Sequence, residues 1–188
     1  AASIGSGVSI ALMNIHRYEG ALSKANLDPL TNVANRSGFF SDIIPKAAAT
    51  EDRYALCMLD IDDFKLINDT YGHDAGDRVL IRLADLLRQL RGDLYVARFG
   101  GEEFVLLAAL HGTESPASIG RAICRKVEQT AFFDGQTHPV TVSVGVCQWK
   151  RDIPMANQIK AADEQMYRAK RTGKNRVCAL DLSGAADA

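Results

Sequence analysis

Two groups of acidic residues are the part of this sequence best suited to chemistry. Asp60, Asp62 and Asp63 close an apolar run, and Glu102 and Glu103 stand between two further apolar runs. Carboxylates that are brought together repel one another unless a cation lies among them. Hard oxygen ligands without neighbouring histidine or cysteine favour Mg²⁺ or Mn²⁺ over zinc. Each group taken alone is better explained as an acidic turn in solvent, and it is the combination of both groups at adjacent strand ends that favours a cation site.

A pair of such ions would define the type of reaction. Two divalent ions about 3.5–4 Å apart can activate an attacking oxygen and stabilise a leaving oxygen in an in-line displacement at phosphorus. The acidic groups therefore predict phosphoryl chemistry, provided that the fold brings them together.

The segment between the two groups, residues 64–77, is rich in side chains that can contact a base or a phosphate. A carboxylate can accept from both N1–H and the exocyclic amine of guanine, whereas adenine presents an acceptor at N1. Asp77 together with Asn68 would therefore favour guanine. Asp77 has a competing interpretation as a helix N-cap or first-turn residue. His73 stands between glycine and aspartate, where histidine is more often a turn residue than a catalyst.

A basic group comprises Lys170, Arg171, Lys174 and Arg176, at the end of the last predicted helix. Cations suit the negative end of a helix, which explains most of them without a ligand. A triphosphate would nevertheless need such cations. The sequence contains neither a G-x-x-x-x-G-K-[ST] loop nor a G-x-G-x-x-G fingerprint, so the familiar glycine-rich nucleotide motifs are absent.

Hydrophobic periodicity predicts the elements that would position these residues. The order from residue 54 to 148 is β-α-β-β-α-β, with strands at 54–59, 94–99, 104–109 and 140–148 and helices opening at 76–77 and covering 116–129. This is the split β-α-β, ferredoxin-like fold of the α+β class, with an antiparallel sheet and helices on one face. A helix at 153–171 and a strand at 176–180 extend it. A helix at 35–49 precedes it and contains Pro45, which the pattern leaves unexplained.

Only four residues separate the two middle strands, which predicts a hairpin. Gly100 and Gly101 would supply the positive φ that a tight turn demands, and would also let a phosphate approach the backbone closely. The first strand and the hairpin are neighbours in a ferredoxin-like sheet, so we expect the two acidic groups to meet at one edge.

Composition limits the classes of partner. The 188-residue chain has room for one domain and a short extension, and its 22 basic and 23 acidic residues give a net charge of −1. Bulk charge therefore favours neither nucleic acid nor anionic lipid, and we expect no nucleic-acid partner. Four cysteines without a C-x-x-C pair favour free thiols in a reducing cytoplasm. No run approaches the ~20 apolar residues of a membrane span and no signal peptide is recognisable, so no membrane segment is expected in this part.

The beginning of the chain predicts a connecting element. Apolar side chains over residues 4–25 recur every 3.5 to 3.6 residues, which indicates an amphipathic helix in need of a partner. That partner is either its own domain or the same helix of a second copy. Pro29 ends the helix, because its ring disfavours helical geometry at Asp28. The start without methionine suggests a fragment of a longer protein.

With these residues in place the chain resembles the GGDEF family, the diguanylate cyclases. Gly100-Gly101-Glu102-Glu103-Phe104 matches the family signature, and the resemblance extends from about residue 27 to 180. Further matching stretches are Asp28-Pro29-Leu30-Thr31, residues 60–77, Val142-Ser143-Val144-Gly145-Val146 and residues 162–175. The resemblance implies a palm-like catalytic domain at 28–181, a connecting helix at 1–27 and a disordered tail at 182–188.

The family implies condensation of two GTP molecules into cyclic di-GMP, with release of two pyrophosphates. By resemblance, two Mg²⁺ or Mn²⁺ ions per GTP site would be held by Asp60, the carbonyl of Ile61, Glu102 and Glu103. Glu102 would help to deprotonate the ribose 3′-hydroxyl, and Lys65 would stabilise charge at the transferring phosphate. The remaining substrate contacts would come from Phe64, Asn68, His73, Asp77, Gly100, Gly101, Lys170 and Lys174. Family members often carry arginine where Lys174 stands.

The resemblance also implies partners. Each domain binds one GTP, so two domains must face each other as a homodimer, with the N-terminal helix setting their approach. The stretch from Ser9 to Glu19 resembles the last helix of a GAF sensor, which suggests an upstream sensor domain. We expect a cytoplasmic location, either free or as the cytoplasmic part of a larger membrane-attached protein.

One departure concerns product inhibition. Many family members carry R-x-x-D six residues before the first glycine of the signature, whereas here the register gives Arg91 followed by Leu94 at the acidic position. Asp93 stands one residue early, and neighbouring strand residues point to opposite faces. We therefore expect weak or absent inhibition through this site. Two rival functions are a catalytically silent domain that senses GTP or cyclic di-GMP, and phosphoryl transfer to another nucleotide.

Overall fold

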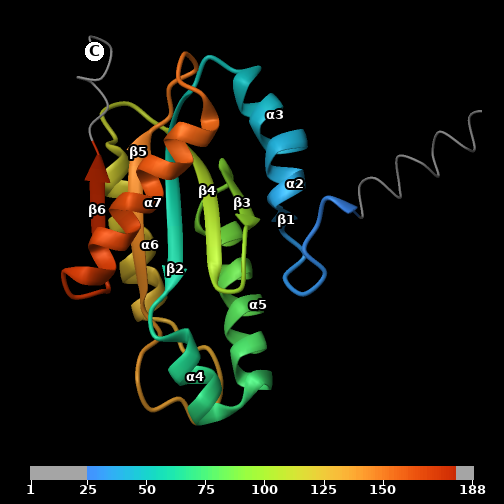
Figure 1. Cartoon of the computed structure of the whole chain (residues 1–188), viewed down its shortest axis with the longest axis vertical. Helices are drawn as coiled ribbons and strands as arrows, with labels where there is room; N and C mark the ends of the chain where they lie inside the picture. The colour runs from blue at the N-terminus through green and yellow to red at the C-terminus, as the bar shows by residue number, and fades with distance from the viewer. Residues whose placement is uncertain (1–24, 181–188) are drawn as a thin grey trace, which may run out of the picture.

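The computed structural model describes residues 25–180 of the chain (Figure 1). The predicted tail lies outside the described residues, and so does the predicted connecting helix except for residues 25–27. The elements in chain order are β1 (Ala34–Asn35), α2 (Arg36–Gly38), the π-helical turn η1 (Phe39–Ile43), α3 (Ile44–Ala48), β2 (Arg53–Ile61), α4 (Phe64–Tyr71), α5 (His73–Leu90), β3 (Leu94–Arg98), β4 (Glu103–Leu110), α6 (Pro116–Glu128), β5 (Val142–Gln148), α7 (Met155–Arg171) and β6 (Val177–Leu180). None of the helices in this part is both long and apolar enough to cross a bilayer.

The six strands form one sheet in the order β1-β3-β4-β2-β5-β6. Its four middle strands pair with one another in antiparallel fashion and have the ferredoxin-like order, which confirms the predicted fold class. The two outer strands pair in parallel, β1 with β3 and β6 with β5, so the sheet is mixed at its edges rather than wholly antiparallel. For β6 the reason is α7, a helical crossover that returns the chain in the direction of β5.

Helices cover both faces of the sheet, whereas the sequence interpretation placed them on one face. Helices α5 and α6 pack on one side and α2–α3 and α7 on the other (Figure 1). The two cores divide the side chains of β2 alternately, with Ala55, Cys57 and Leu59 in the first and Tyr54, Leu56 and Met58 in the second. The uninterrupted apolar run of β2 is typical of a strand buried on both faces, and this pattern in the sequence indicates helices on both sides of the sheet.

Helix α7 lies unusually close to the sheet at Gly145 of β5. A Cβ atom added there would lie 1.9 Å from the carbonyl oxygen of Ala162 and 2.2 Å from the nitrogen of Met166. Any side chain at this position would push the helix outward, so Gly145 is required by packing rather than by backbone conformation. The close crossing fixes where the C-terminal turn of α7 meets the edge of the sheet.

Pro45 receives an explanation from the π-helical turn. The helix predicted at 35–49 is present, but as α2, η1 and α3 in succession, with Pro45 in the first turn of α3. Proline cannot donate to the carbonyl four residues earlier. The π turn immediately before it shifts the hydrogen bonding to i→i−5, so the missing donor falls where the register changes.

The segment after β2 contains a helix that the sequence interpretation missed. Helix α4 ends at Gly72, whose φ of 86° separates it from α5. Helix α5 begins at His73, three residues before the predicted opening at Gly76. Asp77 is therefore its fifth residue, and the N-cap or first-turn interpretation of this aspartate is wrong.

The four cysteines are free, as predicted, and Cys57, Cys124 and Cys147 are buried. Burial raises the pKa of the Cys124 thiol to about 12 and that of Cys147 to about 11. These thiols are therefore protonated packing residues of the core.

Candidate functional site

The two acidic groups meet where β2 and β4 lie side by side. Asp60 is directly opposite Glu103 in the antiparallel register, and the amide of Ile61 donates to the carbonyl of Glu102 over 3.4 Å. Strand β2 runs two residues further than predicted, so Asp60 lies within the strand and its side chain is only 6% exposed. The predicted convergence is confirmed for Asp60, Glu102 and Glu103.

The other two aspartates do not join this cluster. The buried carboxylate of Asp62 accepts hydrogen bonds from Thr141 and Ser143. Asp63 has a left-handed backbone, with φ 53°, and its carboxylate binds Lys174 at 2.6 Å. The five predicted carboxylates are therefore reduced to three, because the strand pleat and the turn send Asp62 and Asp63 elsewhere.

Asp60 carries an incompletely compensated charge. Its Oδ2 lies 2.7 Å from Nζ of Lys170, while its Oδ1 is buried and has no hydrogen-bond partner. Burial raises the pKa of Asp60 to about 6, and the neighbouring Glu102 and Glu103 add to this, although Lys170 opposes the rise. The single ion pair with Lys170 therefore does not fully compensate the negative charge of the Asp60 carboxylate.

These residues fit a divalent cation. Within residues 25–180, no three acidic, histidine or cysteine side chains are arranged so that they could hold a metal ion together, so any such site would have to draw its ligands inward. The free Oδ1 of Asp60 and the nearby carboxylates of Glu102 and Glu103 are hard oxygen ligands that a cation could share. The donor set is therefore suited to Mg²⁺ or Mn²⁺.

The signature turn is held by a fork of hydrogen bonds. Arg98 donates from Nε and Nη2 to the carbonyls of Gly100 and Gly101 at 2.7–3.2 Å, and its Nη1 binds Asp28 at 2.9 Å. Sequence reasoning quoted Asp28 as part of a motif but gave it no role, and missed Arg98. Neither could be assigned without seeing that residues 70 positions apart meet.

The prediction that Gly100 and Gly101 supply positive φ is wrong, since neither is among the positive-φ residues of the described chain. Space is the reason at Gly100, where an added Cβ would lie 2.7 Å from Oε2 of Glu103. The absence of a side chain therefore leaves room for the carboxylate of Glu103 at the turn.

The candidate base-binding residues meet at the junction of α4 and α5. A Cβ added to Gly76 would lie 1.9 Å from Oδ1 of Asn68 and 3.2 Å from Cζ of Phe64. The amide of Asn68 and the ring of Phe64 therefore rest on the backbone of α5, one residue before Asp77. Asn68 and Asp77, which the sequence suggested as joint guanine contacts, thus come from neighbouring positions of this junction, and their role at a base stays a prediction.

The candidate side chains are available for a ligand. Among residues 25–180, no hydrogen bond or ion pair engages the side chains of Lys65, Asn68, His73, Asp77, Glu102 and Glu103. By contrast, the two lysines expected at the phosphates are already paired, Lys170 with Asp60 and Lys174 with Asp63. Both lysines thus lie beside the end of β2, in contact with carboxylates, and their role at phosphates stays a prediction.

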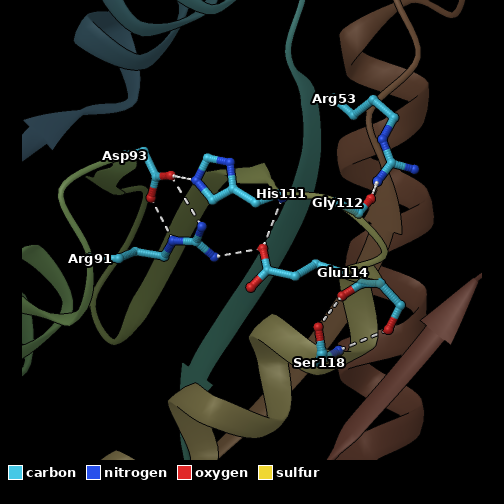
Figure 2. A network of polar contacts seen from close by, with 8 residues as sticks. Arg53, Arg91, Asp93, His111, Gly112, Glu114 and Ser118 are labelled. Atoms are coloured by element: carbon cyan, nitrogen blue, oxygen red, sulfur yellow. Dashed lines mark hydrogen bonds and ion pairs between the residues drawn. The ribbon is translucent and has the colours of Figure 1, made fainter.

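Arg91 belongs to a separate network beside β3 and β4 (Figure 2). Its Nε and Nη2 bind the carboxylate of Asp93 at 2.5 and 3.1 Å, and its Nη1 lies 3.3 Å from Glu114. Asp93 also contacts the His111 ring, and these partners hold its pKa below the usual range despite partial burial. Leu94 is buried in the core. The guanidinium is thus occupied by two carboxylates of its own chain.

A ferredoxin-like sheet with carboxylates at the ends of two central strands, next to a helical junction that can contact a base, defines a palm-like nucleotide-binding domain. The family described as "Diguanylate cyclase, GGDEF domain" matches residues 25–176, and the chain belongs to this family.

Relatives and solved structures agree with this assignment. The chain is 35% identical over 164 residues to "Probable diguanylate cyclase DgcT" of Escherichia coli, covering 84% of this chain and 36% of the relative. It is 32% identical over 184 residues to "Diguanylate cyclase A" of Treponema denticola, covering 93% and 48%. The chain thus spans about half or less of the length of these relatives.

Among solved structures, the GGDEF domain of DgcB from Caulobacter crescentus in complex with c-di-GMP superposes with a TM-score of 0.72 and 33% identity, covering 82% of this chain and 93% of that one. The active GGEEF domain of a diguanylate cyclase from Vibrio cholerae superposes with a TM-score of 0.68 and 32% identity, covering 77% and 96%.

Proposed function

We propose that this domain is a diguanylate cyclase that condenses two GTP molecules into cyclic di-GMP and releases two pyrophosphates. The observation that carries the proposal is the position of Asp60 opposite Glu103 in the β2–β4 register. There one oxygen of the buried Asp60 carboxylate has no hydrogen-bond partner, and the carboxylates of Glu102 and Glu103 lie nearby. Family membership and the free side chains of α4 and α5 support the same conclusion.

In this proposal Asp60, the carbonyl of Ile61, Glu102 and Glu103 hold two Mg²⁺ or Mn²⁺ ions. The ions would neutralise phosphate charge and lower the pKa of the attacking hydroxyl. Glu102 helps to accept the proton of the ribose 3′-oxygen, for which its unpaired carboxylate is suited.

The basic residues then act on the phosphates. Lys65, at the start of α4, is exposed and unpaired, and stabilises charge at the transferring phosphate. Lys170 would exchange Asp60 for phosphate oxygens once a metal ion supplies positive charge to Asp60. Lys174, whose ion pair with Asp63 is exposed, would exchange that carboxylate for phosphate directly. This exchange explains why two proposed phosphate ligands are found on aspartates.

The guanine base is read by Asn68 and Asp77, with Phe64 and His73 lining the pocket and the backbone of Gly100 and Gly101 close to the phosphates. The carboxylate of Asp77 matches the two donors of guanine and disfavours adenine. Asp77 therefore disfavours the rival function, phosphoryl transfer to another nucleotide.

Dimerisation is part of the proposed mechanism. The domain supplies one set of site residues, whereas closing the ring requires two 3′-oxygens to attack two GTP molecules. We propose that two domains face each other, that residues 1–27 connect them to an upstream sensor, and that the protein works in the cytoplasm.

The experiment that tests the function is product analysis. The purified domain is incubated with GTP and Mg²⁺ at several protein concentrations, and the products are separated by chromatography beside Glu102→Gln and the exposed control Glu51→Gln. We expect cyclic di-GMP from wild type and the control only, at a rate that rises faster than protein concentration. GTP binding without product, at concentrations where the domain is dimeric, would favour the silent sensor.

Product inhibition is expected to be weak or absent. Any ligand phosphate would have to displace Asp93 and Glu114 from Arg91, and buried Leu94 offers no acidic partner. Adding cyclic di-GMP to initial-rate assays should therefore change turnover less than about twofold, with or without Arg91→Ala. Submicromolar inhibition that Arg91→Ala removes would contradict this expectation.

A further inference from the structure

The turn between α7 and β6 has an unfavourable backbone. Gly173, Lys174 and Asn175 have φ values of 124°, 58° and 45°, so three consecutive residues are outside the usual region and two of them are not glycine. Such conformations persist only where surrounding contacts hold them. The turn matters because Lys174 is one of the two lysines assigned to phosphate.

Asp62 is the residue that holds this turn. Only 4% exposed, its carboxylate accepts the backbone N–H of Asn175 at 2.9 Å and the hydroxyls of Thr141 and Ser143 at 2.8 and 2.6 Å. No lysine or arginine of residues 25–180 forms an ion pair with it. Three donors bind its two oxygens, and these contacts direct Asp62 to Thr141, Ser143 and Asn175 rather than to the acidic cluster, although in sequence it stands between the predicted ligand Asp60 and Asp63.

The next residue makes a second contact with the same turn. Asp63, itself left-handed with φ 53°, binds Nζ of Lys174 at 2.6 Å. The side chain of Asn175 is held from the other side, where its Nδ2 donates to Glu128 at 2.8 Å. Asp62 and Asp63, which follow β2, therefore bind the consecutive turn residues Asn175 and Lys174.

We propose that Asp62 is a positioning residue that sets the phosphate-binding lysines relative to Asp60. Through the Asn175 amide it fixes the strained turn to the end of β2, the strand that also carries Asp60. The turn follows α7 directly, so the same contact fixes the end of the helix where Lys170 lies. The proposal rests on the proposed function for the identity of the ligand, but the contact itself can be tested separately.

Two substitutions separate the contact from the charge. In Asp62→Asn the amide oxygen can still accept from the Asn175 N–H, while the amide nitrogen donates to the Ser143 hydroxyl, which can reverse its role. In Asp62→Ala the Asn175 N–H has no acceptor. The proposal therefore expects asparagine to preserve function and alanine to impair it.

The first measurement is amide hydrogen exchange at Asn175, followed by NMR. This amide should be protected in wild type and in Asp62→Asn, and should exchange at least about tenfold faster in Asp62→Ala. Equal protection in Asp62→Ala would overturn the proposal, whatever the domain does with GTP.

The second measurement is steady-state kinetics. Asp62→Ala should raise KM for GTP about tenfold with kcat changed less than about threefold, and in a double-mutant cycle its effect should be clearly smaller in the Lys174→Ala background, where only the part that acts through Lys170 remains. Thr141→Val, which removes a hydroxyl from the same carboxylate but spares the Asn175 bond, is the matched control and should leave KM unchanged.

Additive effects in the cycle, or a lower melting temperature with an unchanged KM, would show that Asp62 only stabilises the fold. Asp62→Ser replaces the alanine variant if that one does not fold, because it removes the carboxylate oxygen that accepts the Asn175 N–H and leaves a polar hydroxyl in place of a methyl group. If wild type makes no cyclic di-GMP, the proposed function fails, while the exchange data and equilibrium GTP binding still decide the role of Asp62.

Discussion

Replacing Asp60 by asparagine is expected to lower cyclic di-GMP synthesis at least about 1,000-fold and, at the same time, to stabilise the metal-free domain. The loss of activity follows because Asp60 contributes the buried, unpartnered oxygen around which the carboxylates of Glu102 and Glu103 gather. An amide oxygen retains the shape of the ligand but not the negative charge that a divalent cation requires.

The gain in stability follows from the pKa of the same group. Burial raises the folded-state pKa of Asp60 from 3.8 to about 6. Its contribution to stability is therefore fully present below pH 3.8 and is lost as the pH rises through 6. At pH 7.5 the loss is on the order of 2 to 3 kcal/mol, and a neutral amide removes it. Lys170, 32% exposed, can turn to solvent when its partner is neutralised.

Thermal unfolding without metal, measured between pH 4.5 and 7.5, checks this second effect. The melting temperature of Asp60→Asn should exceed that of wild type by roughly 5 °C at pH 7.5, and the difference should shrink towards pH 4.5. Asp152→Asn, which removes an exposed aspartate, is the control and should change neither quantity. If Asp60→Asn were inactive but less stable than wild type at pH 7.5, the negative charge of Asp60 would already be balanced by Lys170 in the metal-free domain, contrary to this prediction.

The central sheet could be predicted because its signals are local. The alternation of Val142, Val144 and Val146, and the four-residue gap between two apolar runs, determine strands and a hairpin without information from elsewhere. Asp60 and the signature glutamates could be placed together because strand order follows from the element order.

The errors arose where distant contacts decide the structure. Asp62 was grouped with Asp60 because the two are neighbours in sequence, but its partners Thr141, Ser143 and Asn175 lie about 80 to 110 residues further along. The need for glycine at position 100 likewise comes from the carboxylate of Glu103, which lies where a side chain would begin, and not from a positive φ. No local pattern reports such contacts.

The second large effect concerns the base. Asp77→Ala is expected to lower kcat/KM for GTP about 100-fold. The substitution removes the charged carboxylate that would accept two hydrogen bonds from guanine, one from N1–H and one from the exocyclic amine. The fold should be unaffected, since Asp77 is exposed, lies in the second turn of α5 and engages no other side chain of residues 25–180.

Inosine triphosphate makes this prediction specific, because it retains N1–H but lacks the exocyclic amine. Wild type should prefer GTP to inosine triphosphate by about tenfold, and this preference should disappear in Asp77→Ala. Asp74→Ala removes a carboxylate from the first turn of the same helix and serves as the matched control, with the preference retained.

Gly76 provides an independent test of the same pocket. Since an added Cβ would lie 1.9 Å from Oδ1 of Asn68, Gly76→Ala must displace the Asn68 amide while leaving Asp77 in place. If Asn68 and Asp77 read one base together, Gly76→Ala should weaken GTP binding and reduce the preference over inosine triphosphate as well. A preference that survives both Gly76→Ala and Asp77→Ala would place the base elsewhere, and would leave the α4–α5 junction without the role proposed for it.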